Sequence, residues 1–175
     1  MGTTDTWDRV FLDFSSAKLE QLTGRICDCV DKLDHRQIWL RGTENENAVG
    51  NLILHLCGNV RQWIGFGIGG KPDVRQRDQE FADRGGVEAG ELKDRLRGTV
   101  AEAVVILRTV GPRQLLETKK IQNYEMSAME AIYHVVEHFS GHAGQIIFST
   151  KQLTGRDLGY YAYLHSPQPP KEQTP

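Results

Sequence analysis

Hydrophobic residues recur at three- and four-residue steps over four long segments, the spacing that places them on one face of a helix. The first predicted helix spans about residues 5–33, and the second about 47–64 with Asn47 as its N-cap. The third covers about 87–110 and stops at Gly111. No segment alternates convincingly between apolar and polar residues, as a half-buried strand does, so we expect no strand.

The fourth helix has the clearest local signal. Ser127 and Glu130 have the spacing of a capping box, in which both side chains accept hydrogen bonds from free backbone N–H groups at the helix start. This helix ends near Gly155, a plausible C′ residue. Four long amphipathic helices in one domain predict an all-α fold, a four-helix bundle with a long connection between helices 2 and 3. On the first helix, Val10 and Phe14 belong to the predicted apolar face.

The long connection runs from Lys71 to Gly86 and is rich in charged residues, among them Arg75, Arg77 and Arg84. Loops of this length are uncommon in compact domains and often carry function. We expect it to be a solvated face, since charged side chains are mostly exposed. The alternative is that its arginines recognise an acidic thiol such as bacillithiol or glutathione.

The composition fits one domain, with residues 1–164 as the bundle and 165–175 as a disordered tail. The chain has 175 residues, with 21 Lys and Arg against 23 Asp and Glu, so charge gives no reason to expect nucleic acid as a partner. No signal peptide or membrane-spanning run is visible, which predicts a cytoplasmic protein. Cys27, Cys29 and Cys57 lack the spacing of a zinc knuckle and are expected to be small buried side chains.

The histidines suggest chemistry. His134, His138 and His142 follow one another at four-residue steps, which places them along one ribbon of the fourth helix. His55 lies within the apolar second helix, four residues before Asn59. Two histidines from one helix and one from a facing helix would leave a coordination position open, as in catalytic zinc sites. The alternative for each is a hydrogen-bonded core or surface histidine.

A competing pattern is His134-Val-Val-Glu137-His138, which matches the H-x-x-E-H motif of inverted zinc peptidases. No third carboxylate ligand follows it in the sequence. Glu137 directly precedes His138 and so lies about 100° round the helix, where we expect it to be solvated. We interpret this pattern as a coincidence.

The segments Asn-Leu-Ile-Leu-His55-Leu and His138-Phe-Ser-Gly-His142-Ala-Gly-Gln145-Ile together resemble the DinB-like superfamily. The similarity covers nearly the whole chain to about Leu164, including the helix order and the long connection. It implies a four-helix bundle, often a homodimer, that holds a divalent metal ion through three histidines. Carried over by position, those ligands are His55, His138 and His142, and zinc or nickel is the expected ion.

The resemblance leaves His134 outside the ligand set, as an entrance residue, a surface histidine or a support for the ligands. Gln145 and Asn59 become candidates to orient the metal-bound imidazoles. Characterised relatives include thiol-dependent S-transferases and isomerases, which implies a small-molecule substrate and a low-molecular-weight thiol as cosubstrate. Two alternatives stay open: a metal-dependent hydrolase, and a non-catalytic, stress-related bundle that binds a metal or ligand.

Overall fold

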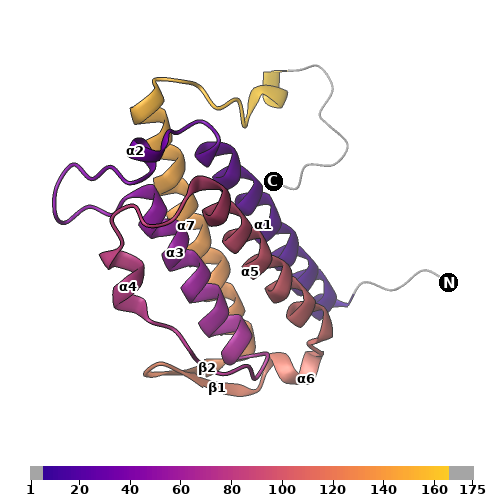
Figure 1. The fold of residues 1–175 in the computed structure, drawn as a ribbon. Coiled ribbons are helices and arrows are strands. Elements are labelled where there is room, and N and C mark those ends of the chain that lie inside the picture. Colours follow the sequence, from indigo (N-terminus) through magenta and orange to yellow (C-terminus); the bar gives the residue numbers. More distant parts are fainter. Residues whose placement is uncertain (1–5, 166–175) are drawn as a thin grey trace.

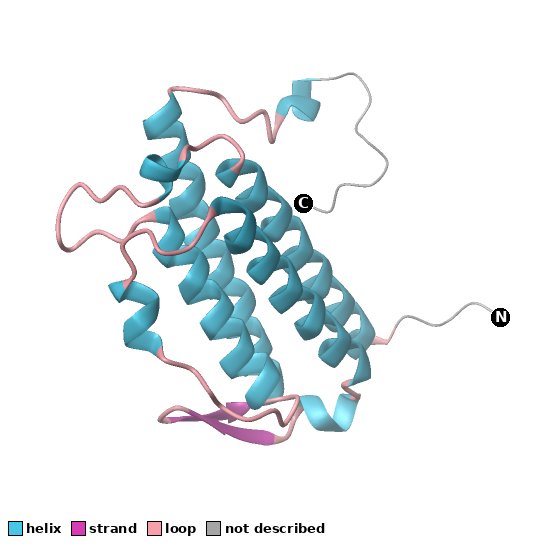
Figure 2. Ribbon diagram, in the orientation of Figure 1, coloured by secondary structure: helices cyan, strands magenta, loops and turns pink. Residues whose placement is uncertain are grey.

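The computed structural model describes residues 6–165 and shows four long helices packed side by side (Figures 1 and 2). These are α1 (Trp7–Val30), α3 (Val49–Val60), α5 (Ala89–Thr109) and α7 (Ala128–Thr154). Helices α1 and α3 each pack against both α5 and α7, so α1 and α3 lie diagonally across the bundle. The predicted four-helix bundle is confirmed.

The local signals of α7 are confirmed as well. The Ser127 side chain accepts a hydrogen bond from the Glu130 backbone N–H, and the Glu130 carboxylate accepts one from the Ser127 N–H. Gly155 ends the helix in the left-handed conformation with φ 64°, which costs a glycine little. These interactions fix where α7 starts and stops, and therefore where its histidines lie.

Two predictions about helix ends and faces are wrong. Helix α3 begins at Val49 after Ala48, which has no side-chain capping bond, so Asn47 is not its N-cap. Val10 and Phe14 are 55% and 47% exposed. The buried face of α1 is rotated away from them because it includes serine and threonine. Their hydroxyl groups donate to the carbonyl four residues earlier, which lets polar residues enter the core without matching the hydrophobic pattern.

The core consists of apolar side chains from all four long helices, and Phe139 on α7 is the largest that is fully buried. Cys27, Cys29 and Cys57 are buried and free, as predicted.

Among residues 6–165 no helix is long and apolar enough to cross a membrane. The predicted disordered tail falls, beyond residue 165, outside the described part of the chain.

Five short helical elements complete the described chain. They are α2 (His35–Ile38), the π-helix η1 (Arg61–Phe66), α4 (Arg77–Ala82), α6 (Pro112–Leu115) and the 3-10 helix η2 (Ala162–His165). The predicted second helix therefore continues through Gly65 as η1. Its wider turns are visible where Gly67 N–H donates to Gln62 O, five residues earlier. π-helical turns of this kind frequently occur at functional sites.

The expectation of no strand is wrong. Strands β1 (Thr118–Ile121) and β2 (Tyr124–Ser127) form an antiparallel hairpin directly before α7. Each strand has only four residues, too few for an alternating pattern to stand out from its surroundings. Ile121 is buried and pairs with Tyr124 across a tight turn. The hairpin lies at one end of the bundle, where α3 continues into η1 (Figure 1).

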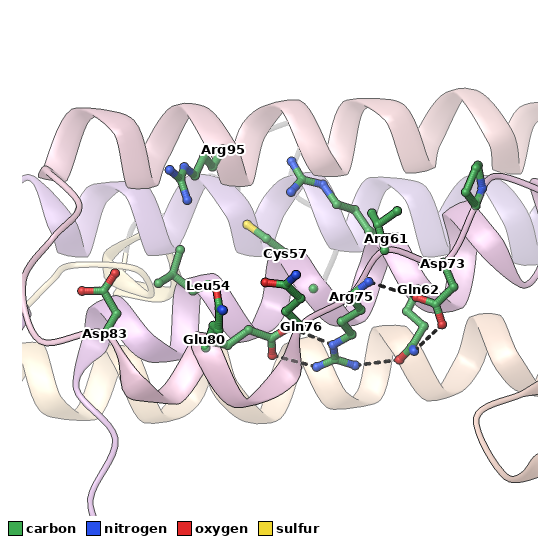
Figure 3. Close-up of a pocket in the computed structure, with 14 residues that line it drawn as sticks. Leu54, Cys57, Arg61, Gln62, Asp73, Arg75, Gln76, Glu80, Asp83 and Arg95 are labelled. Carbon is green, nitrogen blue, oxygen red and sulfur yellow. Dashed lines mark hydrogen bonds and ion pairs between the residues drawn. The ribbon is translucent and has the colours of Figure 1, made fainter.

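The connection from Lys71 to Gly86 is only partly the solvated face that we expected. Its helix α4 packs on α3, and the side chains of Arg75 and Glu80 are just 4% and 9% exposed (Figure 3). Asn51 on α3 holds this segment in place, because its side-chain amide donates to the backbone carbonyl oxygens of Glu80 and Asp83. Arginine and glutamate can be buried here because they pair with each other.

Candidate metal centre

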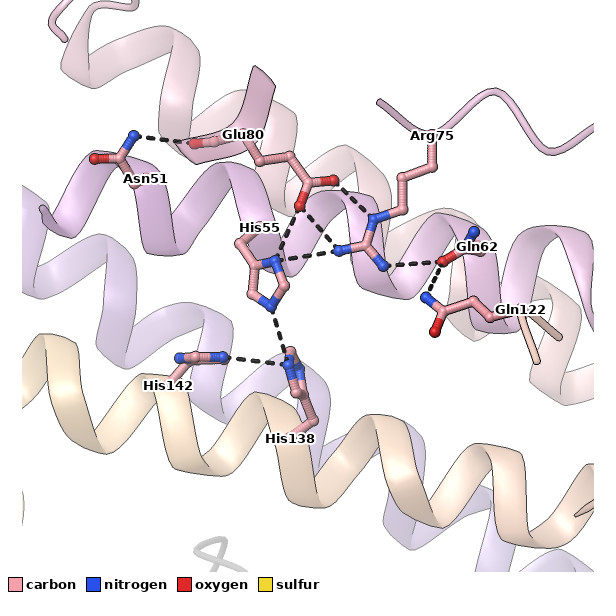
Figure 4. Close-up of polar contacts among 8 residues, drawn as sticks. All are labelled: Asn51, His55, Gln62, Arg75, Glu80, Gln122, His138 and His142. Atoms are coloured by element: carbon pink, nitrogen blue, oxygen red, sulfur yellow. Dashed lines mark hydrogen bonds and ion pairs between the residues drawn. The ribbon is translucent and has the colours of Figure 1, made fainter. Parts of the chain in front are cut away.

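Three histidines meet in the middle of the bundle, between α3 and α7 (Figure 4). The Nε2 atom of His138 lies 3.1 Å from Nε2 of His55 and 3.2 Å from Nε2 of His142. Each of the three residues offers one ring nitrogen, and these nitrogens all lie within 4.8 Å of one another. The structure thus brings together the three residues that the family resemblance selected.

A buried carboxylate fixes the protonation of His55. Its Nδ1 lies 2.9 Å from Oε2 of Glu80, which also accepts a hydrogen bond of 2.9 Å from Arg75. Because an ionised carboxylate can only accept, we assign the His55 proton to Nδ1. Nη2 of Arg75 also lies 3.1 Å from Nδ1, but a lone pair on Nδ1 would repel the Glu80 oxygen at 2.9 Å, so the carboxylate decides the assignment. The Nε2 atom of His55 therefore presents a lone pair to the cluster.

His142 is oriented in the same way. Its Nδ1 lies 2.7 Å from Oε1 of Gln145, one turn further along α7. An amide oxygen accepts hydrogen bonds, so Nδ1 carries the proton and Nε2 is again a free lone pair. The prediction that Gln145 supports a ligand histidine agrees with this contact, although metal binding itself stays a prediction.

With the protons of His55 and His142 on Nδ1, too few protons remain for the three Nε2 atoms that face one another. When the imidazoles are neutral, only His138 can carry a proton on Nε2, and it can donate to His55 or His142 but not to both. The other short contact then has no hydrogen bond, and if His138 carries its proton on Nδ1 instead, both contacts join lone pairs that repel each other. A cation placed between the three nitrogens replaces this repulsion with three favourable contacts.

The spacing also fits a metal ion. Two nitrogens bound to one tetrahedral zinc ion at about 2.0–2.1 Å lie about 3.3 Å apart, close to the 3.1 and 3.2 Å of the two pairs that include His138, and the third pair lies within 4.8 Å. The outer nitrogens of His55 and His142 already hold a carboxylate and an amide, the kind of partner that orients metal-bound imidazoles. The three residues fit a divalent ion with one position left open.

Burial and charge keep His138 and His142 unprotonated near neutral pH. Burial, reinforced by the neighbouring histidines and Arg75, lowers the pKa of His138 to about 3. Burial also lowers the pKa of His142, against the opposing effect of its hydrogen bond to Gln145. Neutral imidazoles are the form that binds metals, so the site needs no deprotonation near neutral pH.

Sequence reasoning missed Glu80, because it lies 25 residues beyond His55 in a segment that looks solvated. Burial alone would raise the pKa of this carboxyl, but hydrogen bonds from Arg75 and His55 outweigh burial and hold the pKa below its ordinary value. A close approach to α3 makes the contact possible. A Cβ atom on Gly58 would lie 1.8 Å from Oε1 of Glu80, so glycine is required here for the carboxylate to reach His55.

The other two candidates from the sequence lie beside the cluster rather than in it. His134 packs against Trp63 with ring centroids 4.2 Å apart and the planes tilted by 43°, and its ring lies 5.6 Å from that of His138. Asn59 is buried, but its Oδ1 has no hydrogen-bond partner among the described residues. Both line a cavity of about 290 Å³ that opens next to His55 and His138. Glu137 is exposed, as expected for a residue outside the site.

Fold and site together define a class of protein: a four-helix bundle with a three-histidine cluster that is compatible with a metal ion. The chain matches the family described as "Protein of unknown function (DUF1572)" over residues 7–164, and it belongs to that family. No protein of curated function matches the sequence.

Solved structures agree on the fold. A conserved protein from Enterococcus faecalis superposes with a TM-score of 0.68 at 16% identity, covering 82% of this chain and 97% of that one. The DinB-like protein YjoA from Bacillus subtilis gives 0.64 at 12% identity, covering 84% and 96%. A mutant of a mycothiol-dependent maleylpyruvate isomerase gives 0.59 at 15% identity, covering 77% of this chain and 60% of that chain. The predicted DinB-like fold is confirmed.

The lowered pKa of His138 makes stability depend on pH in a defined direction. Unfolded His138 takes up a proton near its ordinary pKa of 6.5, whereas the folded residue does so only near 3. The unfolded state therefore binds more protons in this window, and the free energy of unfolding of metal-free protein falls as the pH drops from about 6.5 towards 3. Urea denaturation of His138→Gln should show a shallower fall than wild type, and identical slopes would contradict this assignment.

Proposed function

We propose that this protein is a metal-dependent enzyme in which His55, His138 and His142 bind one divalent ion, zinc or nickel. The observation that carries the proposal is the convergence of three Nε2 atoms that have at most one proton to share. Imidazole nitrogens suit both ions, and neither requires a further protein ligand when a substrate fills the open position.

We further propose that the reaction transfers a group from an electrophile to a low-molecular-weight thiol, in which the new S–C bond forms as the bond to the leaving group breaks and the leaving group departs with that electron pair. A divalent ion at this site would lower the pKa of a coordinated thiol, so that a thiolate is present near neutral pH. Arg77 lines the adjoining cavity, and its charge favours a thiol that carries carboxylate groups. A thiol cosubstrate is also named in the description of one structural neighbour, the mycothiol-dependent isomerase.

The chain offers a base for the proton that such a thiol must lose. His134 lines the cavity, and burial lowers its pKa below the ordinary value, so its imidazole is neutral and can accept a proton. Its packing against Trp63 holds the ring in one orientation. We assign it the role of proton acceptor, outside the metal ligands. The homodimer and the cytoplasmic location expected from the sequence stay predictions.

The first prediction of this proposal concerns metal content. Protein purified without a histidine tag should contain about one zinc or nickel ion per chain, measured by plasma mass spectrometry, and His138→Ala should contain almost none. Glu80→Gln keeps the size of the side chain but removes the charge that fixes His55, so metal affinity should fall by about 10–100-fold.

The matched control is His134→Ala, one helical turn from His138 on the same helix. It should retain the wild-type metal content, because His134 lies outside the cluster of ring nitrogens. Equal metal content in wild type and His138→Ala, or loss of metal in His134→Ala, would contradict the assignment of ligands.

The second prediction concerns the reaction. Metal-loaded protein should consume an activated aryl or alkyl electrophile only when glutathione, bacillithiol or mycothiol is added, as followed by product chromatography. His134→Ala should keep its metal but lose about 10²–10⁴-fold in turnover, the usual contribution of a positioned base. Ester or amide cleavage without a thiol would favour the hydrolase instead. A metal-loaded protein that turns over no member of such panels would favour the non-catalytic bundle.

A further inference from the structure

The cavity beside the histidines contains an unusual concentration of polar atoms without partners. Among the described residues, four buried side-chain nitrogen or oxygen atoms lack a hydrogen bond, and three of them belong to residues that line this cavity. They are Asn59 Oδ1, Trp63 Nε1 and His138 Nδ1. Asn59 and Trp63 are only 3% and 2% exposed. Unpaired buried polar groups are costly, so their grouping favours a ligand that supplies both donors and acceptors once these side chains shift to reach it.

A second hollow adjoins this cavity and has the opposite character. It measures about 640 Å³ and is bordered mainly by Phe11, Met126, Met129 and Tyr133. Methionine side chains adapt to ligands of different shape, and aromatic rings offer flat apolar surfaces. Tyr133 is 65% exposed although it belongs to α7. We call this hollow the apolar groove.

The two hollows are connected through shared walls. His134 and Met126 line both the polar cavity and the apolar groove. The two hollows are therefore neighbours, and a molecule in the polar cavity that is long enough to pass His134 would reach the methionines. The rim of the groove carries Glu130 and Glu137, which disfavour a negatively charged extension.

We infer that the site acts on an amphipathic small molecule, whose polar head enters the cavity beside His138 and whose apolar tail lies in the apolar groove. This inference rests on the proposed function and adds the class of substrate to it. The head lies beside Asn59 and Trp63, where it provides the missing hydrogen bonds. The tail covers Met126, Met129 and Tyr133, so each added methylene group is transferred from water to an apolar surface.

The test uses a series of alkyl hydroxamates, from acetohydroxamate to octanohydroxamate, with affinity measured by calorimetry on zinc-loaded and metal-free protein. The hydroxamate head binds divalent ions and both donates and accepts hydrogen bonds. Affinity should rise about twofold for each added CH₂, because the groove covers one side of the chain; complete burial would give about fourfold. Asn59→Leu should weaken every member of the series by a similar factor.

Two variants on the same helix locate the tail. Tyr133→Ala should flatten the dependence on chain length while acetohydroxamate still binds as in wild type. Phe148→Ala is the matched control, since Phe148 is 61% exposed on α7 but does not line the groove. Phe148→Ala should keep the wild-type dependence of affinity on chain length.

The dependence of affinity on chain length tests the amphipathic substrate, whereas the dependence of affinity on zinc tests the metal centre. A flat dependence in wild type, or an unchanged one in Tyr133→Ala, would overturn the amphipathic substrate whether or not zinc is bound. Equal affinity of acetohydroxamate for zinc-loaded and metal-free protein would instead count against the metal centre. A dependence on chain length that persists in metal-free protein supports the groove independently of the ion.

Discussion

The contact between Glu80 and His55 is the interaction on which the proposed site depends. It sets the proton of His55 on Nδ1 and so turns an Nε2 lone pair towards the two histidines of α7. Without that carboxylate, His55 would be free to turn its ring or change tautomer, and the three nitrogens would not be held facing one another. The chain thus uses a residue from its long connection to complete a centre whose ligands come from two bundle helices.

A buried carboxylate is stable only when it is fully paired, and much of the surrounding structure supplies those partners. Arg75 binds Glu80 through two nitrogens, and Gln62 accepts from the third guanidinium nitrogen. Asn51 holds the backbone of Glu80 on α3, and Gly58 leaves room for its side chain. The π-helical turn η1 carries Gln62 and the cavity residue Trp63, so the local widening of the helix contributes to the same network.

The bundle and the pairing of His138 with His142 could be predicted from the sequence because both depend on spacing along single helices. His138 and His142 are one turn apart on α7, and the family resemblance added His55 across the bundle. Glu80 could not be found in this way, since its burial depends on how a charged connection folds back on α3. The hairpin was missed because its strands are short, and Val10 and Phe14 were misplaced because serines share the buried face of α1. Contacts between distant segments, rather than helix periodicity, account for these differences.

The coordination of the bound ion tests the central claim most directly. X-ray absorption spectroscopy at the metal edge, on protein loaded with one equivalent of zinc, should show three imidazole nitrogens at about 2.0–2.1 Å and a light atom in the remaining position. A sulfur neighbour at about 2.3 Å would mean that a buried cysteine binds the metal instead. Fewer than three imidazoles would likewise contradict a centre built from His55, His138 and His142.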